Sequence, residues 1–452
     1  MKIGEYIYQT KTIPNSDLFS FSRPGFPYIY HSWATELLIY LPYKFLGFWG
    51  VSLLYSSVLT LAFLFMYQTA KLISKKINYL ALVWSVPIGI SIAGGKTRVF
   101  GLLFFAIIYY LFTQFILKSS SEKGHNSKII WFIPLVFMAW ANFHGSFALG
   151  LVAFAVLSIF GKKRKTLFTI LLLSMLATLI NPFGVNIWET VLIGASQTIN
   201  LRHLNPDWRP LFSADTNSQI IAILFITLYV VAKFLKLKMR MGHELTILIF
   251  LITALISSRF TLIFLVVFAP FLNQVFEELK NKTPPKILRS KTLLFPIIAT
   301  FSVFVLITIQ NLLEITFAYS NLKNYSQYVT IKTSNNSLYS FWPYNAFEYI
   351  GKNLQLKNIF IETNSSGFLL LQNPNRKLFY YGAMDNFVND NNFFAYEYLS
   401  LIEAKDNWQP TLEKYDIHAI VLPPHLPLIA KLKNESNWQK VYEDREAIVF
   451  IK

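Results

Sequence analysis

Long apolar runs separated by short polar connections are the feature that most constrains the fold of this chain. Crossing a bilayer as a helix takes about 20 apolar residues, and in lipid only a helix or a closed barrel satisfies its own backbone hydrogen bonds. The pattern therefore predicts an α-helical polytopic membrane protein with about ten transmembrane helices. We expect them near 48–70, 78–95, 98–117, 129–143, 146–160, 166–181, 219–235, 244–258, 260–277 and 292–312.

The composition agrees with a membrane protein. It argues against a nucleic-acid-binding protein and against a protein built on disulfides or thiolate metal sites. The 452 residues are 54% hydrophobic and only 14% charged, with a net charge of +17. The Lys and Arg residues fall in short clusters between the apolar runs, which is the positive-inside signal and not the footprint of a nucleic-acid-binding protein. The chain has no Cys, so it has no disulfide framework and no thiolate metal site.

The distribution of Lys and Arg predicts the orientation of the helices in a plasma membrane. One set of connections, at 71–76, 118–128, 162–165, 233–240 and 280–291, carries 19 of these residues, and the alternating set carries five. The first set is therefore expected in the cytoplasm. This orientation places the amino-terminal loop and the tail after about 313 outside the membrane. Because a polar start cannot cross alone, we expect a further helix upstream of Met1.

Three domains are expected. Residues 1–47 form an extracytoplasmic loop and an interfacial helix interrupted by Pro42, 48–312 form the multi-span transmembrane domain, and 320–452 form a small extracytoplasmic α/β domain. In the last domain, short apolar runs predict strands at 358–362, 377–381, 417–422 and 447–451, with helices at 391–405 and 409–415.

Ionisable residues near the first apolar run are candidates for catalysis. Asp17 lies in an aromatic loop, where it could accept a proton from an acceptor hydroxyl or orient a sugar phosphate through a divalent cation. An Asx-turn without chemistry is the alternative. His31 and Glu36 bracket Trp33 at the start of the interfacial helix. A charged His31 could bind phosphate, and a helix cap is its alternative role.

Basic and polar residues at the outer helix ends are candidates for substrate binding. Arg98 and Arg259 are predicted on the outer face of the membrane, where positive charge is disfavoured. Binding of a lipid phosphate substrate would explain both residues, and anchoring of the helix ends to lipid headgroups is the alternative. Asn142 and His144 lie with Gly145 at a turn between two apolar runs, which suits either a ligand site or a capped turn.

The longest outer connection adds Asp207 and Trp208, an acid and an aromatic that could stack on a sugar ring or anchor the interface. The chain has no Walker A loop, no G-x-G-x-x-G and no H-E-x-x-H, so nucleotide and common zinc chemistries lack their signatures. No resident metal or cofactor is predicted, apart from the divalent cation considered for Asp17. The donor group is expected from the membrane.

Taken together, the motifs resemble those of bacterial membrane proteins related to the GT-C glycosyltransferases, the relatives of protein mannosyltransferases and lipid A aminoarabinose transferases. The resemblance covers nearly the whole chain. It is carried by Ile13-Pro-Asn-Ser-Asp17-Leu-Phe-Ser-Phe, His31-Ser-Trp33 with Glu36, Trp140-x-Asn142-x-His144-Gly, Asn181-Pro-x-Gly184 and Asp207-Trp208-x-Pro210.

The resemblance implies transfer of a sugar from a polyprenyl-phosphate donor to an extracytoplasmic acceptor in cell-envelope synthesis. Asp17 would be the loop carboxylate, His31 and Glu36 would line the site, and Arg98, His144 and Arg259 would lie near the donor phosphate. Two departures stand out: the first helix with its acidic motif is absent, and the tail carries Tyr381-Gly-Ala-Met-Asp385 where relatives have Asp-Gly-Arg. A non-catalytic relative, a transporter of lipid-linked glycan and an O-antigen type ligase or polymerase are the alternatives.

Overall fold

The structure is a computed structural model in which the chain divides into two compact units. Unit 1 contains Met1, residues 3–9 and residues 31–314, and unit 2 contains Lys2, residues 10–30 and residues 315–452. Each unit is described by itself. The residues that the structure describes are 1–93, 97–119, 128–196, 208–213, 216–281, 302, 343–353, 356–382, 384 and 394–452.

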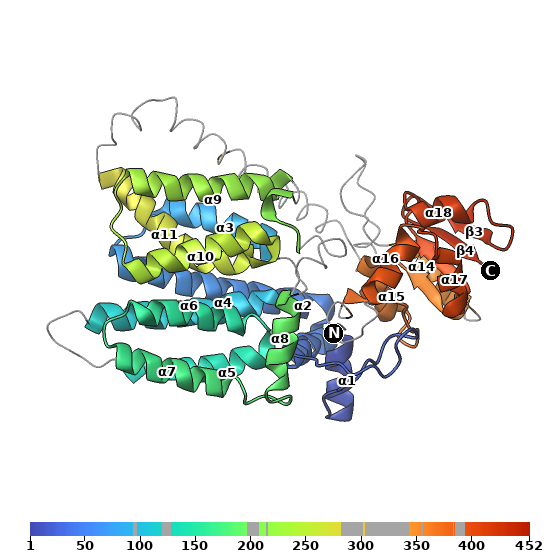
Figure 1. Ribbon diagram of the computed structural model, residues 1–452, viewed down its shortest axis with the longest axis horizontal. Helices are drawn as coiled ribbons and strands as arrows, with labels where there is room; N and C mark the ends of the chain where they lie inside the picture. The colour runs from blue at the N-terminus through green and yellow to red at the C-terminus, as the bar shows by residue number, and fades with distance from the viewer. Residues whose placement is uncertain are drawn as a thin grey trace. The chain divides into compact units, whose positions relative to one another are not determined.

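Unit 1 is helical, and its long helices run side by side (Figure 1). The apolar runs predicted from the sequence fall on these helices, except for 292–312, which lies outside the described residues apart from Ser302. The helices are α1 (Lys2–Thr10), α2 (Trp33–Ser74), α3 (Tyr79–Ala93), α4 (Arg98–Ser119), α5 (Ile133–Phe143), α6 (Phe147–Ile159), α7 (Arg164–Ala177), α8 (Asn186–Ser196), α9 (Thr216–Phe234), α10 (Met241–Ile256) and α11 (Thr261–Asn281), with short 3-10 turns at Lys128–Phe132, Leu211–Ser213 and Ser258–Phe260.

Helix α2 is broken where the sequence predicts the end of the interfacial helix. Gly47 has φ 59° and ψ −146°, a conformation that residues with a Cβ rarely adopt. Pro42, in the preceding turn, has no N–H to donate to the helix. Gly50 is also required here, because a Cβ at this position would lie 2.2 Å from the carbonyl oxygen of Pro42. The two halves of α2 therefore follow different directions.

The core of unit 1 is built around α11, which packs against α2, α3, α4 and α10. Aromatic rings fill the spaces between helices, as where Phe105 of α4 stacks on Phe250 of α10 at 5.1 Å and Phe225 of α9 contacts Phe268 of α11 at 4.4 Å. These rings are almost completely buried. Burial of large apolar side chains is the main stabilising contribution to such a bundle.

The outer surface of unit 1 is also apolar. Large exposed apolar side chains among the described residues lie on unit 1, with Tyr396 as the one exception. In water such a surface is unfavourable, and it is typical of a protein that contacts lipid. Within the described residues, three helices are long and apolar enough to cross a membrane: Trp33–Ser74, Arg98–Leu117 and Ser258–Lys280. Shorter apolar helices accompany them, including 218–234 and 241–256.

Two helices of unit 1 lie where the sequence analysis expected loops. Helix α1 falls in the polar amino-terminal segment, and its Gly4 packs so closely on α2 that a Cβ there would lie 2.1 Å from the carbonyl oxygen of Glu36. Helix α8 follows the Asn181–Gly184 turn, in the long connection after α7. Both helices are short and carry polar residues, so neither has the long apolar run from which the other helices were predicted.

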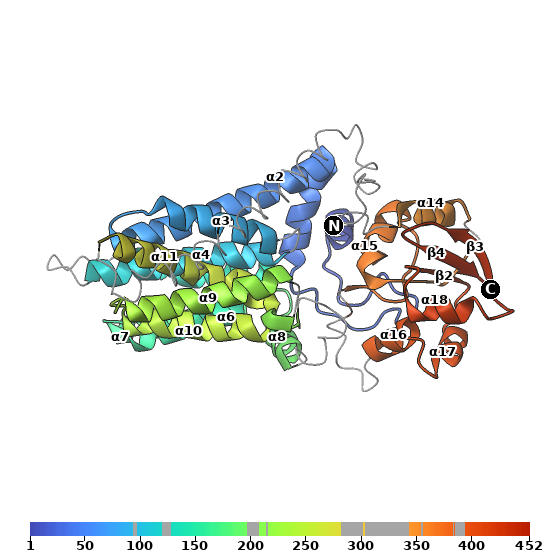
Figure 2. The same ribbon diagram turned by 90° about the horizontal axis from the view of Figure 1, so that it is seen from above.

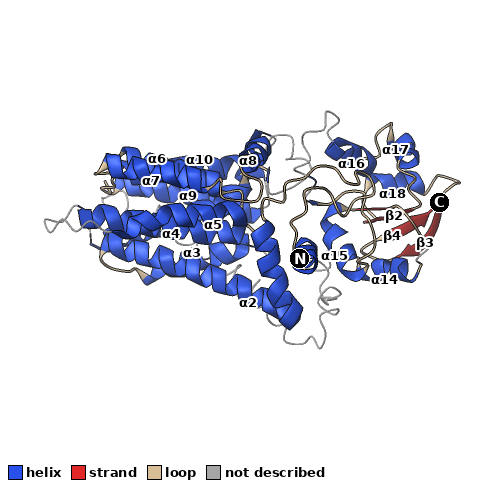
Figure 3. Cartoon of the chain, turned by 90° about the horizontal axis from the view of Figure 1, so that it is seen from below, coloured by secondary structure: helices blue, strands red, loops and turns tan. Residues whose placement is uncertain are grey.

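Unit 2 contains a four-stranded sheet of strand order β1-β2-β4-β3 (Figure 3). Strands β1 (Ile359–Ile361) and β2 (Ala419–Leu422) are parallel, and β4 (Ile448–Ile451) is antiparallel to β2 and to β3 (Gln439–Glu443). The three strands other than β3 are almost completely buried, because helices cover both faces of the sheet (Figure 2). These helices are α14 (Tyr344–Lys352), α15 (Thr363–Gln372), α16 (Phe394–Ile402), α17 (Trp408–Lys414) and α18 (Pro427–Leu432).

The strand predictions for unit 2 are correct for β1, β2 and β4, and wrong for 377–381. That segment is extended, but it pairs with the amino-terminal loop and not with the sheet: Phe21 donates its N–H to the carbonyl of Leu378 (2.9 Å), and Leu378 donates to Phe19 (2.8 Å). Strand β3 was missed because it is a solvated edge strand with few apolar residues. Residues 10–30 thus belong to unit 2, whereas the sequence analysis grouped them with 31–47.

Candidate functional site

The turn between α5 and α6 holds a buried histidine in one defined hydrogen-bonded form. Ser146 donates its backbone N–H to Nδ1 of His144 (3.1 Å), so Nδ1 is an acceptor. The Ser146 hydroxyl, 2.8 Å from the same nitrogen, must then donate its proton there, while its oxygen accepts from Nε1 of Trp140 (3.1 Å). A neutral His144 therefore carries its proton on Nε2.

Helix α4 begins directly against this turn because Gly101 has no side chain. A Cβ on Gly101 would lie 2.4 Å from Oγ of Ser146 and 3.5 Å from Nδ1 of His144. Arg98 is the first residue of α4. The close approach at Gly101 consequently brings the amino-terminal turn of α4, with its guanidinium group, to the α5–α6 turn.

His31 lies over the other side of the same turn. A Cβ built on Gly145 would be 3.5 Å from Cδ2 of His31 and 3.3 Å from Cγ2 of Val191 in α8. The sequence pattern around this glycine suits either a ligand site or a capped turn. In the structure its open side is covered by the imidazole ring of His31, so Gly145 makes room for a second histidine beside His144.

Arg259 is held by an aromatic ring. Its guanidinium carbon lies 4.3 Å from the ring centre of Trp208, which is buried. The backbone joins the two segments, since Ser258 donates its N–H to the carbonyl of Arg209 (2.9 Å). A cation over an indole face at this distance is an attractive contact. Trp208 is thus a support for Arg259, and Asp207 lies outside the described residues.

The electrostatics of His144 show that these groups share one region of unit 1. Burial lowers the pKa of His144 well below its usual range, and the positive charges of Arg259, His31 and Arg98 lower it further, in that order. The structure therefore brings together four of the predicted site residues as a cationic cluster, defined as His31, Arg98, His144 and Arg259, around a neutral imidazole.

The lowered pKa of His144 predicts how stability depends on pH. In the unfolded chain the imidazole has an ordinary pKa of about 6.5, so it binds a proton there first as the pH falls. The contribution of His144 to the free energy of unfolding is therefore constant above a pH of about 6.5. Below that pH, protonation of the unfolded chain lowers the free energy of unfolding by at most about 1.4 kcal/mol per pH unit. We expect the melting temperature in detergent to fall between pH 7.5 and pH 5, and to fall less in His144→Asn. Identical pH slopes for the two proteins would contradict this origin.

Asn142 ties helices together. It accepts a hydrogen bond from Nε1 of Trp33 (3.0 Å) and donates from Nδ2 to the carbonyl oxygens of Met138 and Ile180 (2.9 Å each). Its amide therefore connects the start of α2 with α5 and with the segment after α7. These contacts give Asn142 a structural role, and its predicted contact with substrate stays a prediction.

Glu36, in the first turn of α2, forms an ion pair with the amino group of Met1 at 2.7 Å. Both groups are partly exposed, so the pair contributes little to stability. Glu36 belongs to unit 1, as the cationic cluster does, but its charge is not among those that shift the pKa of His144.

Asp17 belongs to unit 2 and is 5% exposed. Each carboxylate oxygen accepts two hydrogen bonds: Oδ1 from the Phe19 N–H (3.3 Å) and the Tyr381 hydroxyl (2.5 Å), and Oδ2 from the Ser20 N–H (3.0 Å) and hydroxyl (2.6 Å). The local bonds are those of an Asx-turn. Asp17 fastens the loop to the tail, and burial raises the pKa of Tyr381, which keeps its hydroxyl protonated as a donor.

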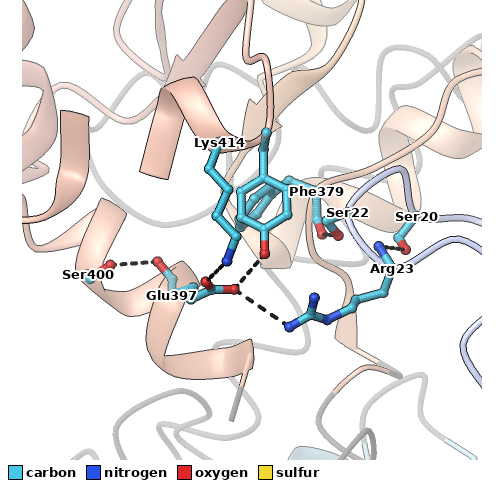
Figure 4. Close-up of polar contacts among 8 residues, drawn as sticks. Ser20, Ser22, Arg23, Phe379, Glu397, Ser400 and Lys414 are labelled. Carbon is cyan, nitrogen blue, oxygen red and sulfur yellow. Dashed lines mark hydrogen bonds and ion pairs between the residues drawn. The ribbon is translucent and has the colours of Figure 1, made fainter. Parts of the chain in front are cut away.

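A second set of contacts between the loop of residues 10–30 and the tail lies around Glu397 of α16 (Figure 4). It was not predicted from the sequence. Its carboxylate pairs with Lys414 of α17, accepts a hydrogen bond from the Tyr415 hydroxyl (2.6 Å), and lies 3.8 Å from the Arg23 guanidinium. Arg23 also stacks over the ring of Phe394 at 4.8 Å. These residues are far apart in sequence, and only the position of Arg23 in the same loop as Asp17 could have indicated the contact.

Among the described residues, no three His, Asp or Glu side chains gather in a way that could hold a metal ion. Compared with known proteins, the sequence matches no protein-family model and no curated protein. The function is therefore argued from the residues and their geometry.

Proposed function

We propose that this chain is a membrane glycosyltransferase of the GT-C type, which transfers a sugar from a polyprenyl-phosphate donor to an extracytoplasmic acceptor. The observation that carries the proposal is the cationic cluster at the end of an apolar helix bundle. Two arginines beside a buried imidazole are suited to the phosphate of a lipid whose chains lie beside the bundle, because guanidinium groups bind phosphate with two hydrogen bonds.

The chemistry follows from where charge develops. The acceptor hydroxyl attacks the anomeric carbon, the bond from that carbon to the phosphate oxygen breaks, and the phosphate leaves with the electron pair. Arg98 and Arg259 stabilise the charge that grows on this phosphate. His31 is the predicted catalytic residue that lies with them, and we assign to its neutral form the acceptance of the hydroxyl proton, so that Arg98 and Arg259 alone neutralise the phosphate before transfer. Neutral His144 offers a donor at Nε2.

The membrane part of the proposal is supported by the apolar surface of unit 1 and its long apolar helices. We propose ten spans, with the connections rich in Lys and Arg in the cytoplasm and unit 2 on the outer face of a bacterial plasma membrane.

A second function is favoured by the state of Asp17. Both of its carboxylate oxygens are saturated with hydrogen bonds. A protein that binds lipid-linked glycan without transferring it needs the cationic cluster and no general base. Transfer of a labelled sugar from its polyprenyl phosphate to endogenous membrane acceptors separates the two functions, because only the enzyme releases the free polyprenyl phosphate.

The binding step is tested with polyprenyl monophosphate and the full chain in detergent, using native mass spectrometry. Arg98→Gln and Arg259→Gln each remove a charge-assisted hydrogen bond worth about 1.5 to 3 kcal/mol, so we expect affinity to fall at least 10-fold in each. Arg164→Gln, in the exposed first turn of α7, is the matched control and should bind like the wild type. Unchanged binding in both variants would exclude the cluster as the phosphate site.

A further inference from the structure

A cavity with a partly polar lining lies in unit 1, among α2, α4, α10, α11 and the connection between α9 and α10. Its volume is about 220 Å³, and the polar residues of its lining are Tyr109, Thr113, Lys238, Arg240, His243 and Gln274. Among the described residues, no Asp or Glu belongs to the lining. The volume is below the range of about 300 to 1,000 Å³ that is typical for drug-sized ligands, so the cavity fits a small polar group.

A hydrogen-bonded pair of side chains in the lining keeps one free hydrogen-bond donor in either proton arrangement. The hydroxyl of Tyr109 lies 2.8 Å from Nδ1 of His243, and both residues line the cavity. If the hydroxyl donates to Nδ1, the neutral imidazole carries its proton on Nε2. If Nδ1–H donates to the hydroxyl oxygen, the tyrosine proton is available instead. The pair therefore always retains one donor that its internal hydrogen bond does not use.

Two cations stand at the same cavity. Lys238 and Arg240 are exposed residues of its lining, and within the described part of the chain neither has a carboxylate at ion-pair distance. Glu244, one turn into α10, is instead paired with Lys233 and accepts a hydrogen bond from Tyr229 (3.1 Å).

The amino terminus of α10 adds to this positive field. Arg240 is its N-cap, and no side chain caps the first turn. Uncapped N–H groups and the helix dipole favour an anion at this point. Positive charge, hydrogen-bond donors and a cavity are therefore found at the same place in unit 1.

We infer that this cavity binds a phosphate group, separately from the cationic cluster of the proposed active site. Lys238 and Arg240 neutralise the two charges of a phosphomonoester, and the Tyr109–His243 pair donates to one of its oxygens. The phosphate could belong to an anionic lipid headgroup or to a soluble phosphate compound, since both present the same group. The exposed side chain of Met241, which follows Arg240 in the chain, would lie along the acyl chains of a lipid.

The inference is tested by native mass spectrometry of the full chain in detergent, with phosphatidic acid as the probe. We expect Lys238→Gln/Arg240→Gln to reduce the bound fraction at least 10-fold. Lys162→Gln/Lys165→Gln is the matched control, because these exposed lysines flank the α6–α7 turn, which approaches the same end of α10: a Cβ on Gly242 would lie 3.2 Å from Cβ of Phe160. This control should bind normally.

Two further measurements separate the sources of the phosphate and the two sites. Displacement of phosphatidic acid by millimolar inorganic phosphate indicates a soluble ligand, and resistance to displacement, together with no adduct of phosphatidylcholine, indicates a lipid headgroup. Arg98→Gln/Arg259→Gln should leave this binding unchanged. Equal phosphatidic acid binding by Lys238→Gln/Arg240→Gln and by its control would overturn the inference, whatever the fate of the proposed transferase activity.

Discussion

Replacing Gly150 by alanine is expected to lower the stability of unit 1 and to disorder the α5–α6 turn. The new Cβ would lie 2.2 Å from Cζ3 and 2.5 Å from Cη2 of Trp140. The indole is completely buried, and it stacks on Phe137 at 5.8 Å and on Phe105 at 6.2 Å, so it cannot move aside without displacing other rings. Overpacking of this kind costs about 1 to 3 kcal/mol and occasionally more.

The consequence extends to the proposed active site, because Trp140 donates the hydrogen bond that orients Ser146, which in turn fixes the proton position of His144. We expect the melting temperature in detergent to fall by several degrees and the affinity for polyprenyl phosphate to fall with it. Gly367→Ala, in α15 with open space around the position, is the control, and the better helix propensity of alanine should leave it unchanged or slightly more stable. Equal melting temperatures for Gly150→Ala and the wild type would refute the packing argument.

Asp17→Ala is expected to detach the loop of residues 10–30 from the rest of unit 2. The substitution leaves the Ser20 hydroxyl, the Tyr381 hydroxyl and two backbone N–H groups without their acceptor in a buried place. Each buried group left unsatisfied costs about 1 to 3 kcal/mol, so the loss is expected to exceed about 3 kcal/mol. Limited proteolysis with thermolysin should cut the loop at least 10-fold faster than in the wild type.

Tyr381→Phe is the matched variant, because it removes a single donor and leaves the three local hydrogen bonds of Asp17 in place. Its effect should be the smaller one. The double variant should be little worse than Asp17→Ala, since the two residues share one interaction. If Asp17 acted instead as a catalytic base on an otherwise stable loop, Asp17→Ala would abolish sugar transfer and leave the protease resistance of the loop unchanged.

The elements predicted correctly are those whose signal is local. An apolar run such as 98–117 specifies a helix by its own composition, and α4 forms there. Strands β2 and β4 are buried on both faces, so each has a continuous apolar run from which it could be predicted. Strand β3 and helices α1 and α8 are partly solvated and lack such runs, and they were missed.

The site could be predicted only in part, for the same reason. Arg98 and Arg259 were singled out because positive charge is disfavoured outside the membrane, and the structure places both near His144. No pattern in the sequence shows that Gly101 and Gly145 bring α4 and His31 to this turn, because close approach depends on the partner helix. The carboxylate of Asp17 was assigned chemistry, and its pairing with Tyr381, 364 residues later, carries no local signal.

The 364 residues between Asp17 and Tyr381 determine when unit 2 can fold during synthesis of the chain. Residues 10–30 leave the ribosome before any helix of unit 1 beyond α1, yet their partners Leu378, Tyr381 and Glu397 follow those helices in the chain. At about 5 to 20 residues per second, the loop waits roughly 20 to 70 s for Tyr381. During this interval Phe19 and Phe21 lack the rings of Tyr381 and Phe379 that they contact in unit 2. Unit 2 can therefore close only after the helices of unit 1 have been synthesised, and a chain terminated before Tyr381 would expose an unclosed loop that quality-control proteases can recognise.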